Sequence, residues 1–171
     1  LPIQHGYDLF DMVREEEHAM LTDTLHVVRE GVLGQAWCEL PLKSIHQLSK
    51  NGRCAYIIPS EFLNSDYGKL VKTYLIKSKT LRHIIVIDFE ENVFDDALTT
   101  ASIILCANDN LTEKVQFSNI QSLQDLSKID EVITKYPNIS ETEQTYNFSE
   151  LNPEIKWKTY YQKQNSIKFK N

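Results

Sequence analysis

The amino-acid sequence predicts an α/β fold in which one β-α-β crossover is followed by an antiparallel strand. Three short runs of apolar, mostly β-branched residues predict strands at residues 54–58, 81–89 and 100–107. A helical pattern of apolar residues, at positions 70, 71, 74 and 75, lies between the first two runs. A loop rather than a helix joins the second run to the third, so the third strand is expected to return antiparallel.

The turns and caps around these runs support the same assignment. Asn51 and Gly52 form a turn signal before the first strand, and Pro59 ends that strand. Ser65 or Asp66 can cap the following helix. These residues therefore fix the boundaries of the first strand and the helix.

The region before the first strand predicts two helices. Apolar residues in residues 7–30 mostly follow the i, i+3, i+4 spacing of an amphipathic helix, which ends at Gly31 and Gly34. Residues 42–48 predict a short helix with Pro41 in its first turn. We therefore expect a helical leader in front of the sheet.

The pattern is weaker after residue 108. Residues 115–117 predict an edge strand, and residues 123–136 predict a helix that Pro137 stops. Residues 139–152 are rich in Glu, Thr, Asn and Ser, a composition typical of a loop or linker.

The three strong strands are apolar nearly throughout, which is expected when both faces of a sheet are covered. His83, within the second strand, is expected at the boundary between core and surface. The core is predicted on adjacent strands with two helix residues packed over it: Ile57, Ile84, Val86, Ile103, Leu105, Leu70 and Tyr74.

Composition excludes several classes of protein. The 171 residues carry a net charge of −6, which argues against nucleic-acid binding by bulk attraction of the whole chain. The last sixteen residues, however, hold five lysines and no acid, and the rest carries 13 basic and 24 acidic groups, a net charge of −11. No apolar run approaches the roughly 20 residues of a membrane helix, and no export signal is visible, so a cytoplasmic protein is expected.

Two stretches of the sequence resemble a known family. The run NGRCAYIIPSEFLNSDYGKLVKTYL starts at Asn51, and LRHIIVIDFEENVFDDALTTASIILC ends at Cys106. Together with the preceding short helix they resemble the second half of the catalytic domain of adenine-N6 DNA methyltransferases of restriction–modification systems, the TaqI/Eco57I type. The resemblance covers somewhat over a third of the chain.

The resemblance implies part of a Rossmann-like methyltransferase sheet with an antiparallel last strand. It also implies S-adenosylmethionine as the methyl donor of the parent protein, and a target adenine flipped out of duplex DNA. In that family an aromatic residue of the segment that resembles Val93-Phe94 stacks on the flipped base, and the residue at that position here is Phe94.

The basic, aromatic tail is a second candidate site. Lysines neutralise phosphates and rings stack on bases, so Lys156, Trp157, Lys158 and Lys163 are predicted to contact DNA. The alternative is a solvated terminal helix or strand.

Two motifs of the family are missing. The sequence has no glycine-rich donor loop, and its five prolines are isolated, so the Asn/Asp-Pro-Pro-Tyr/Phe catalytic loop is absent. We therefore expect a fragment without turnover by itself. Its predicted parts are a helical leader at 1–40, a partial catalytic domain at 41–120 and a linker toward a target-recognition region at 121–171.

Two other functions remain open on the sequence. The chain could be a non-enzymatic module that binds a partner through the acidic helix at residues 7–30. It could also be half of an enzyme that a second chain completes. Exposed strand edges of a half-domain favour self-association.

Overall fold

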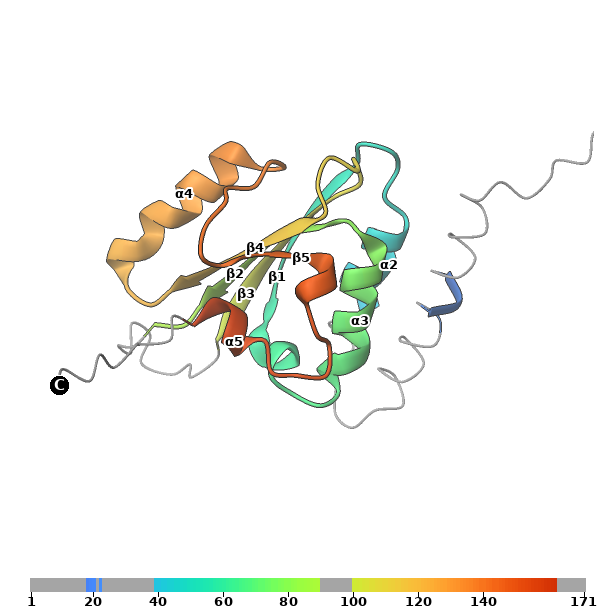
Figure 1. Cartoon of the computed structure of the whole chain (residues 1–171), viewed down its shortest axis with the longest axis horizontal. Helices are drawn as coiled ribbons and strands as arrows, with labels where there is room; N and C mark the ends of the chain where they lie inside the picture. The colour runs from blue at the N-terminus through green and yellow to red at the C-terminus, as the bar shows by residue number, and fades with distance from the viewer. Residues whose placement is uncertain (1–17, 21, 23–38, 90–99, 163–171) are drawn as a thin grey trace, which may run out of the picture.

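The computed structural model describes residues 18–20, 22, 39–89 and 100–162. Its centre is a five-stranded mixed sheet in the order β1-β3-β2-β4-β5 (Figure 1). The strands are β1 Arg53–Pro59, β2 Leu81–Ile87, β3 Ala101–Ala107, β4 Lys114–Ile120 and β5 Thr145–Asn147.

Helices lie on both faces of this sheet. The α-helices are α2 Glu39–His46, α3 Gly68–Ser78, α4 Leu126–Lys135 and α5 Lys158–Tyr161. Four-residue or shorter 3₁₀ helices connect them: η2 Ser60–Leu63, η3 Leu123–Asp125 and η4 Phe148–Glu150. Figure 1 shows α2 and α3 on one face and α4 on the other.

The predicted α/β class and crossover are confirmed. Strand β3 pairs antiparallel with both β1 and β2, so β1 and β2 run parallel with β3 between them. Helix α3 makes the crossover from β1 to β2, and the chain returns through β3 into the gap. The predicted strands at 54–58, 81–89 and 100–107 correspond to β1, β2 and β3.

The C-terminal part differs from the prediction. Strand β4 is not an edge strand, because it pairs parallel with β2 on one side and antiparallel with β5 on the other. Residues 139–152, predicted as a loop or linker, contain β5 and η4 and bury Phe148 and Leu151 in the main core. The described residues on either side of residue 120 therefore pack in one main core.

The leader can be followed only in part. Residues 18–20 and 22 are helical, and the rest of the predicted helix at 7–30 lies outside the described residues. His18 Nδ1 lies 3.2 Å from His46 Nε2 of α2, and Met20 packs against the main core.

Two apolar cores lie on opposite faces of the sheet. The larger joins α2 and α3 to alternate residues of the strands and to the segment 148–161. The smaller lies under α4 and contains Ile85, Leu105, Ile120 and Val132. Helix α4 therefore covers the second face only over the strands β2, β3 and β4.

The predicted core is correct for the inner strands and wrong for β1. Ile84, Val86, Leu105 and Tyr74 are buried, and Ile103 and Leu70 are half-buried. Ile57, in contrast, is 73% exposed. It points to the face that α4 covers, but it lies on the edge strand and outside the apolar core under that helix.

One buried ion pair ties the start of β2 to the end of β3. The Arg82 guanidinium donates to Asp109 Oδ1 at 2.6 Å and to the carbonyls of Lys79 and Leu81, both at 3.1 Å. The Arg82 side chain is fully buried, and that of Asp109 is 9% exposed. Burial opposes ionisation of Asp109, but its bonds to Arg82 and the Leu111 N–H prevail and lower its pKa.

We expect Asp109→Asn to lower the free energy of unfolding by about 3–5 kcal/mol, because it leaves the buried guanidinium of Arg82 uncompensated. The matched control is Asp125→Asn, which removes a surface pair with Lys128 and is expected to cost much less, because solvent screens that pair. Urea unfolding of each variant measures both. Equal losses in the two variants would contradict the role of the buried pair.

His83 is buried in β2, so its predicted place at the core boundary is wrong. Burial lowers the pKa of His83 to about 4. The hydrogen bond to the Asn138 carbonyl opposes this shift, and the nearby charge of Arg82 adds to it. Between about pH 6.5 and 4 the unfolded chain therefore binds a proton that the folded chain does not.

We accordingly expect stability to fall as the pH drops through this window, by about 3 kcal/mol in total from this residue. His83→Gln does not titrate, and its amide can still donate to the Asn138 carbonyl. Unfolding curves at pH 7, 5.5 and 4 should show a shallower loss for the variant. Parallel curves would mean that His83 does not contribute.

Candidate nucleic-acid interface

The carboxyl ends of the parallel strands β1 and β2 form one edge of the sheet. Strand β1 runs directly into η2, and β2 continues to Asp88 and Phe89. Ser60 donates its N–H to the Thr100 carbonyl at 3.0 Å, which fixes the start of β3 at the same edge. In open α/β sheets, ligands bind outside the carboxyl ends of the strands. This edge is therefore the candidate site.

Hydrogen bonds to Leu63, the last residue of η2, and to the following Asn64 hold the segment 151–162 at this edge. The N–H of Trp157 donates to the Leu63 carbonyl at 2.9 Å, and the N–H of Lys158 donates to Asn64 Oδ1 at 2.9 Å. Asn64 Nδ2 donates in turn to the Tyr161 hydroxyl at 2.8 Å. Figure 1 shows α5 beside the carboxyl ends of the strands. Residues more than 90 positions apart thus form one surface.

Trp157, predicted to contact DNA, is fully buried. Its Nε1 donates to the Asn152 carbonyl at 2.9 Å, and its ring meets Phe117 and Tyr160 edge-on, at centroid distances of 5.8 and 6.0 Å. The ring is therefore not presented for stacking on a base. Its contacts position the flanking residues Lys156 and Lys158, which are exposed.

A polar groove lies between η2, the start of α3 and the turn at residues 153–156. It encloses about 490 Å³, including the solvent at its mouth. Three lysines and two acids contribute to a lining made of Asn64, Ser65, Asp66, Lys69, Lys72, Pro153, Glu154, Ile155 and Lys156.

Lys72 forms the floor of this groove and is only 2% exposed. Its Nζ donates to the Ile155 carbonyl at 2.8 Å and to the Leu63 carbonyl at 3.3 Å, and it lies 5.8 Å from the Trp157 ring centroid. Burial lowers the pKa of Lys72, and Asp66 partly opposes this shift. The ammonium joins the two segments that form the groove.

Lys69 and Lys72 were not predicted as site residues from the sequence. The available signal was the position of Lys72 in the buried stripe of α3, with Gly68, Val71 and Leu75 at helical spacing. A lysine in an apolar stripe must find buried acceptors, and here two carbonyls serve.

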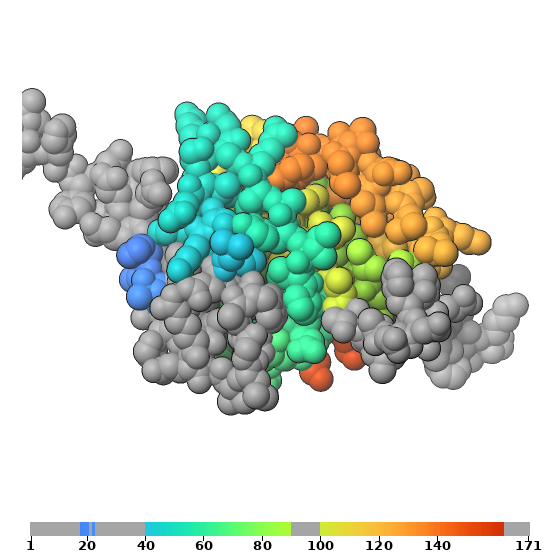
Figure 2. All heavy atoms as spheres, turned by 180° about the vertical axis from the view of Figure 1, so that it is seen from behind, coloured from blue at the N-terminus to red at the C-terminus, as the bar shows by residue number. Residues whose placement is uncertain are grey.

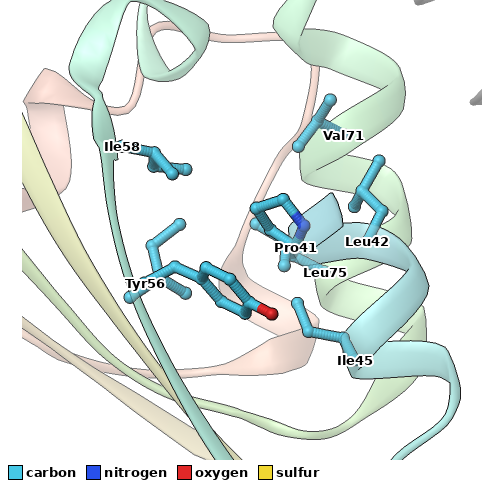
Figure 3. Close-up of a pocket in the computed structure, with 8 residues that line it drawn as sticks. Pro41, Leu42, Ile45, Tyr56, Ile58, Val71 and Leu75 are labelled. Atoms are coloured by element: carbon cyan, nitrogen blue, oxygen red, sulfur yellow. The ribbon is translucent and has the colours of Figure 1, made fainter. Parts of the chain in front are cut away.

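An apolar hollow lies on the α2 side of β1 (Figure 3). Its cavity volume is only about 10 Å³, so the lining side chains nearly fill it. Near it, the Tyr56 hydroxyl donates to Ser44 Oγ at 2.5 Å. Its lining offers packing surface rather than chemistry: Pro41, Leu42, Ile45, Tyr56, Ile58, Val71, Leu75 and Ile104.

Two predicted site residues, Phe94 and Lys163, lie outside the described residues. The described residues on either side of residues 90–99, Phe89 and Thr100, lie at the carboxyl edge. Asp88 is fixed there by its N–H, which donates to the Ile120 carbonyl at 2.9 Å.

The described residues hold only two of the five glycines of the chain. Their two glycines are separate: Gly52 lies in a turn, and Gly68 packs against the backbone of η2. They therefore form no glycine-rich loop.

Within the described residues, no group of three or more His, Cys, Asp or Glu side chains could hold a metal ion. None of the described helices is long and apolar enough to cross a membrane.

Comparison with known proteins confirms the resemblance seen in the sequence. Residues 40–94 match the family model of the Eco57I restriction-modification methylase. The chain is thus similar to part of a restriction–modification methylase.

One relative of the chain is the Type II methyltransferase M.AccI of Acinetobacter calcoaceticus. It is 92% identical over 130 residues, which are 76% of this chain and 24% of that protein. The chain therefore spans about a quarter of the length of its curated relative.

Two solved structures are also similar. One is the methyltransferase subunit of the type I restriction-modification system from Streptococcus thermophilus, with 16% identity over 66% of this chain and 26% of that chain, and a TM-score of 0.47. The other is the type IIG restriction endonuclease BpuSI, with 14% identity over 75% of this chain and 16% of that chain, and a TM-score of 0.44. Both TM-scores are below 0.5, so the fold rests on the strand order and register described above.

We expect Trp157→Ala to lower the free energy of unfolding by about 3–5 kcal/mol, because it empties a fully buried site. Lys158→Ala, one position along and exposed, should change it by less than about 0.5 kcal/mol. Thermal unfolding followed by circular dichroism compares the two. A Trp157→Ala chain as stable as the wild type would show that the ring does not hold this segment in place.

Proposed function

We propose that the chain is a piece of an S-adenosylmethionine-dependent DNA methyltransferase of a restriction–modification system. The parent protein would methylate N6 of adenine, and the piece has no turnover by itself. The observation that supports this proposal is the 92% identity to a Type II methyltransferase over only a quarter of that protein's length. The parent would act on DNA in the cytoplasm.

Different steps of the reaction are assigned to this chain and to the rest of the parent protein. The described residues do not fit the donor, so donor binding and the catalytic loop are assigned to the missing part. This chain would hold the flipped adenine by stacking on Phe94, because extrusion from the helix costs stacking that a flat ring restores. Lys156, Lys158 and Lys163 would neutralise phosphates beside the target.

The polar groove supports a DNA-facing role for the carboxyl edge. Its exposed lysines, Lys69 and Lys156, lie at the same edge as the ends of residues 90–99. Lys69 Nζ lies 2.8 Å from Glu154 Oε1, and this ion pair partly neutralises its charge. We therefore assign phosphate binding mainly to Lys156 and Lys158. Trp157 acts as a positioning residue for both.

The function is tested in a hybrid, in which the 130 residues of this chain that match M.AccI replace the corresponding segment of that protein. Transfer of a labelled methyl group to duplex DNA is expected for the hybrid and not for the isolated chain. Calorimetry should detect no low-micromolar S-adenosylmethionine site on the isolated chain. A hybrid that folds but leaves adenine unmethylated would contradict the proposed function.

Phe94→Ala in the hybrid is expected to weaken retention of the flipped adenine by about 1–3 kcal/mol, the usual contribution of one aromatic stack. Fluorescence of 2-aminopurine at the target base measures this retention. Phe94→Trp is the matched variant and should be better tolerated, since the flat face is kept. If Phe94→Ala and the parent hybrid give the same signal and rate, Phe94 does not stack on the base.

A further inference from the structure

Cys54 of β1 and Cys106 of β3 lie directly opposite each other in the sheet, and the register runs without a shift along the whole of β1. Just beyond β1, the Ser60 N–H donates to the Thr100 carbonyl at 3.0 Å. Because hydrogen-bonded pairs recur at every second residue of an antiparallel ladder, Cys54 and Cys106 form such a pair. Their Cα atoms are therefore expected about 5.5 Å apart, a separation that is common among disulfides.

The two thiols meet on the face of the sheet that α2 and α3 cover. Cys106 belongs to the main core on this face, and Cys54 packs against that core. The side chains are close enough to interact, with the Cys106 thiol hydrogen-bonding to the sulfur of Cys54. A bond between the two sulfur atoms therefore requires rotation of the side chains and no change of strand register.

The two cysteines differ in their exposure to solvent. Cys54 is half-exposed on the edge strand, whereas Cys106 is fully buried. Figure 2, which views the molecule from behind, shows the teal atoms of the chain around β1 at the surface. A small oxidant in solution therefore reaches Cys54 before it reaches Cys106.

The same two residues differ in the ease with which they lose a proton. The hydrogen bond from Cys106 lowers the pKa of Cys54, and burial partly opposes this shift. The bond to Cys54 and complete burial raise the pKa of Cys106. Since the thiolate is the nucleophile, Cys54 is the more reactive of the two. An accessible cysteine of lowered pKa beside a second cysteine is typical of redox-sensitive sites.

We propose that Cys54 and Cys106 form a reversible oxidation site, at which a hydroperoxide converts the two thiols into a disulfide between β1 and β3. The Cys54 thiolate attacks a peroxide oxygen, the O–O bond breaks, and the departing hydroxide takes up a proton as water, which leaves a sulfenic acid on Cys54. The Cys106 sulfur then attacks the Cys54 sulfur, the S–O bond breaks, and hydroxide leaves with the Cys106 proton as a second water. Two thiols and one hydrogen peroxide thus give one disulfide and two waters, and two electrons pass from sulfur to the peroxide.

The oxidation site lies at the end of the sheet opposite to the candidate interface. Cys54 is the second residue of β1, and Cys106 is the last but one of the antiparallel β3. The disulfide fastens the edge strand to the sheet and closes a loop over residues 54–106, which restricts the unfolded chain. The stability of the fold therefore responds to oxidation, whether or not the parent protein is the methyltransferase proposed above.

Peroxide treatment of the folded, full-length chain gives the first test. A Cys38→Ser background removes the third cysteine, which lies outside the described residues. Mass spectrometry after alkylation should find the peptides of Cys54 and Cys106 joined within one chain, with two hydrogens lost, and dithiothreitol should separate them. Two free thiols, a Cys54 that stops at sulfenic or sulfinic acid, or a disulfide only between two chains would overturn the proposal.

Single-cysteine chains in the same background test the order of the two steps. In the Cys106→Ala chain, dimedone should trap a sulfenic acid on Cys54, because the second thiol is gone. In the matched Cys54→Ser chain, the buried Cys106 should react with peroxide at least about tenfold more slowly. Equal rates would overturn the assignment of Cys54 as the attacking thiol. The first test keeps both cysteines and decides the proposal even where one of these variants does not fold.

Thermal unfolding compares the oxidised chain with the reduced one. The disulfide should raise the Tm by several degrees, and reduction should restore the original value. Cys54→Ser, treated in the same way, is the matched control, because peroxide also oxidises methionine and the chain has two. An oxidised chain that melts no higher than the reduced chain would refute the fastening of β1 to the sheet.

Discussion

The insertion of β3 between β1 and β2 is the constraint on which the rest of the structure depends. Because β3 is antiparallel to both, the two flanking strands run parallel and end at the same edge. That edge then receives η2, the start of α3 and residues 88–89. The same insertion places β1 on the outside of the sheet, with β3 as its one described partner. The candidate site and the outer position of β1 are therefore two results of one topology.

Elements with a strong local pattern could be predicted from the sequence. The apolar runs and the stripe of α3 report burial directly, so β1, β2, β3 and α3 were placed correctly. Strand β5 could not be predicted in this way, because three residues paired with β4 leave no periodicity to detect. The exposure of Ile57 could not be predicted either. An apolar run does not show which of its residues a helix such as α4 covers.

The candidate site was only partly predictable for a related reason. The lysines near Trp157 were visible as a cluster, but the burial of the ring depends on Phe117 and Tyr160, and Phe117 comes from β4, 40 positions earlier. The groove combines residues 64–72 with residues 153–156. Two basic residues bind internal acceptors instead of solvent: Arg82 donates to the Asp109 carboxylate, and Lys72 donates to a backbone carbonyl. The charge count of the sequence therefore overstates the cations available to a phosphate backbone.

Gly68 carries a consequence for the evolution of this surface. A Cβ at this position would lie 1.6 Å from the Phe62 carbonyl oxygen, so no side chain fits while η2 keeps its path. Lineages that retain this turn cannot vary position 68. An unchanging glycine there would report backbone crowding and not contact with a ligand. Variation is thereby directed to the exposed neighbours, such as Lys69, which can be exchanged without moving the main chain.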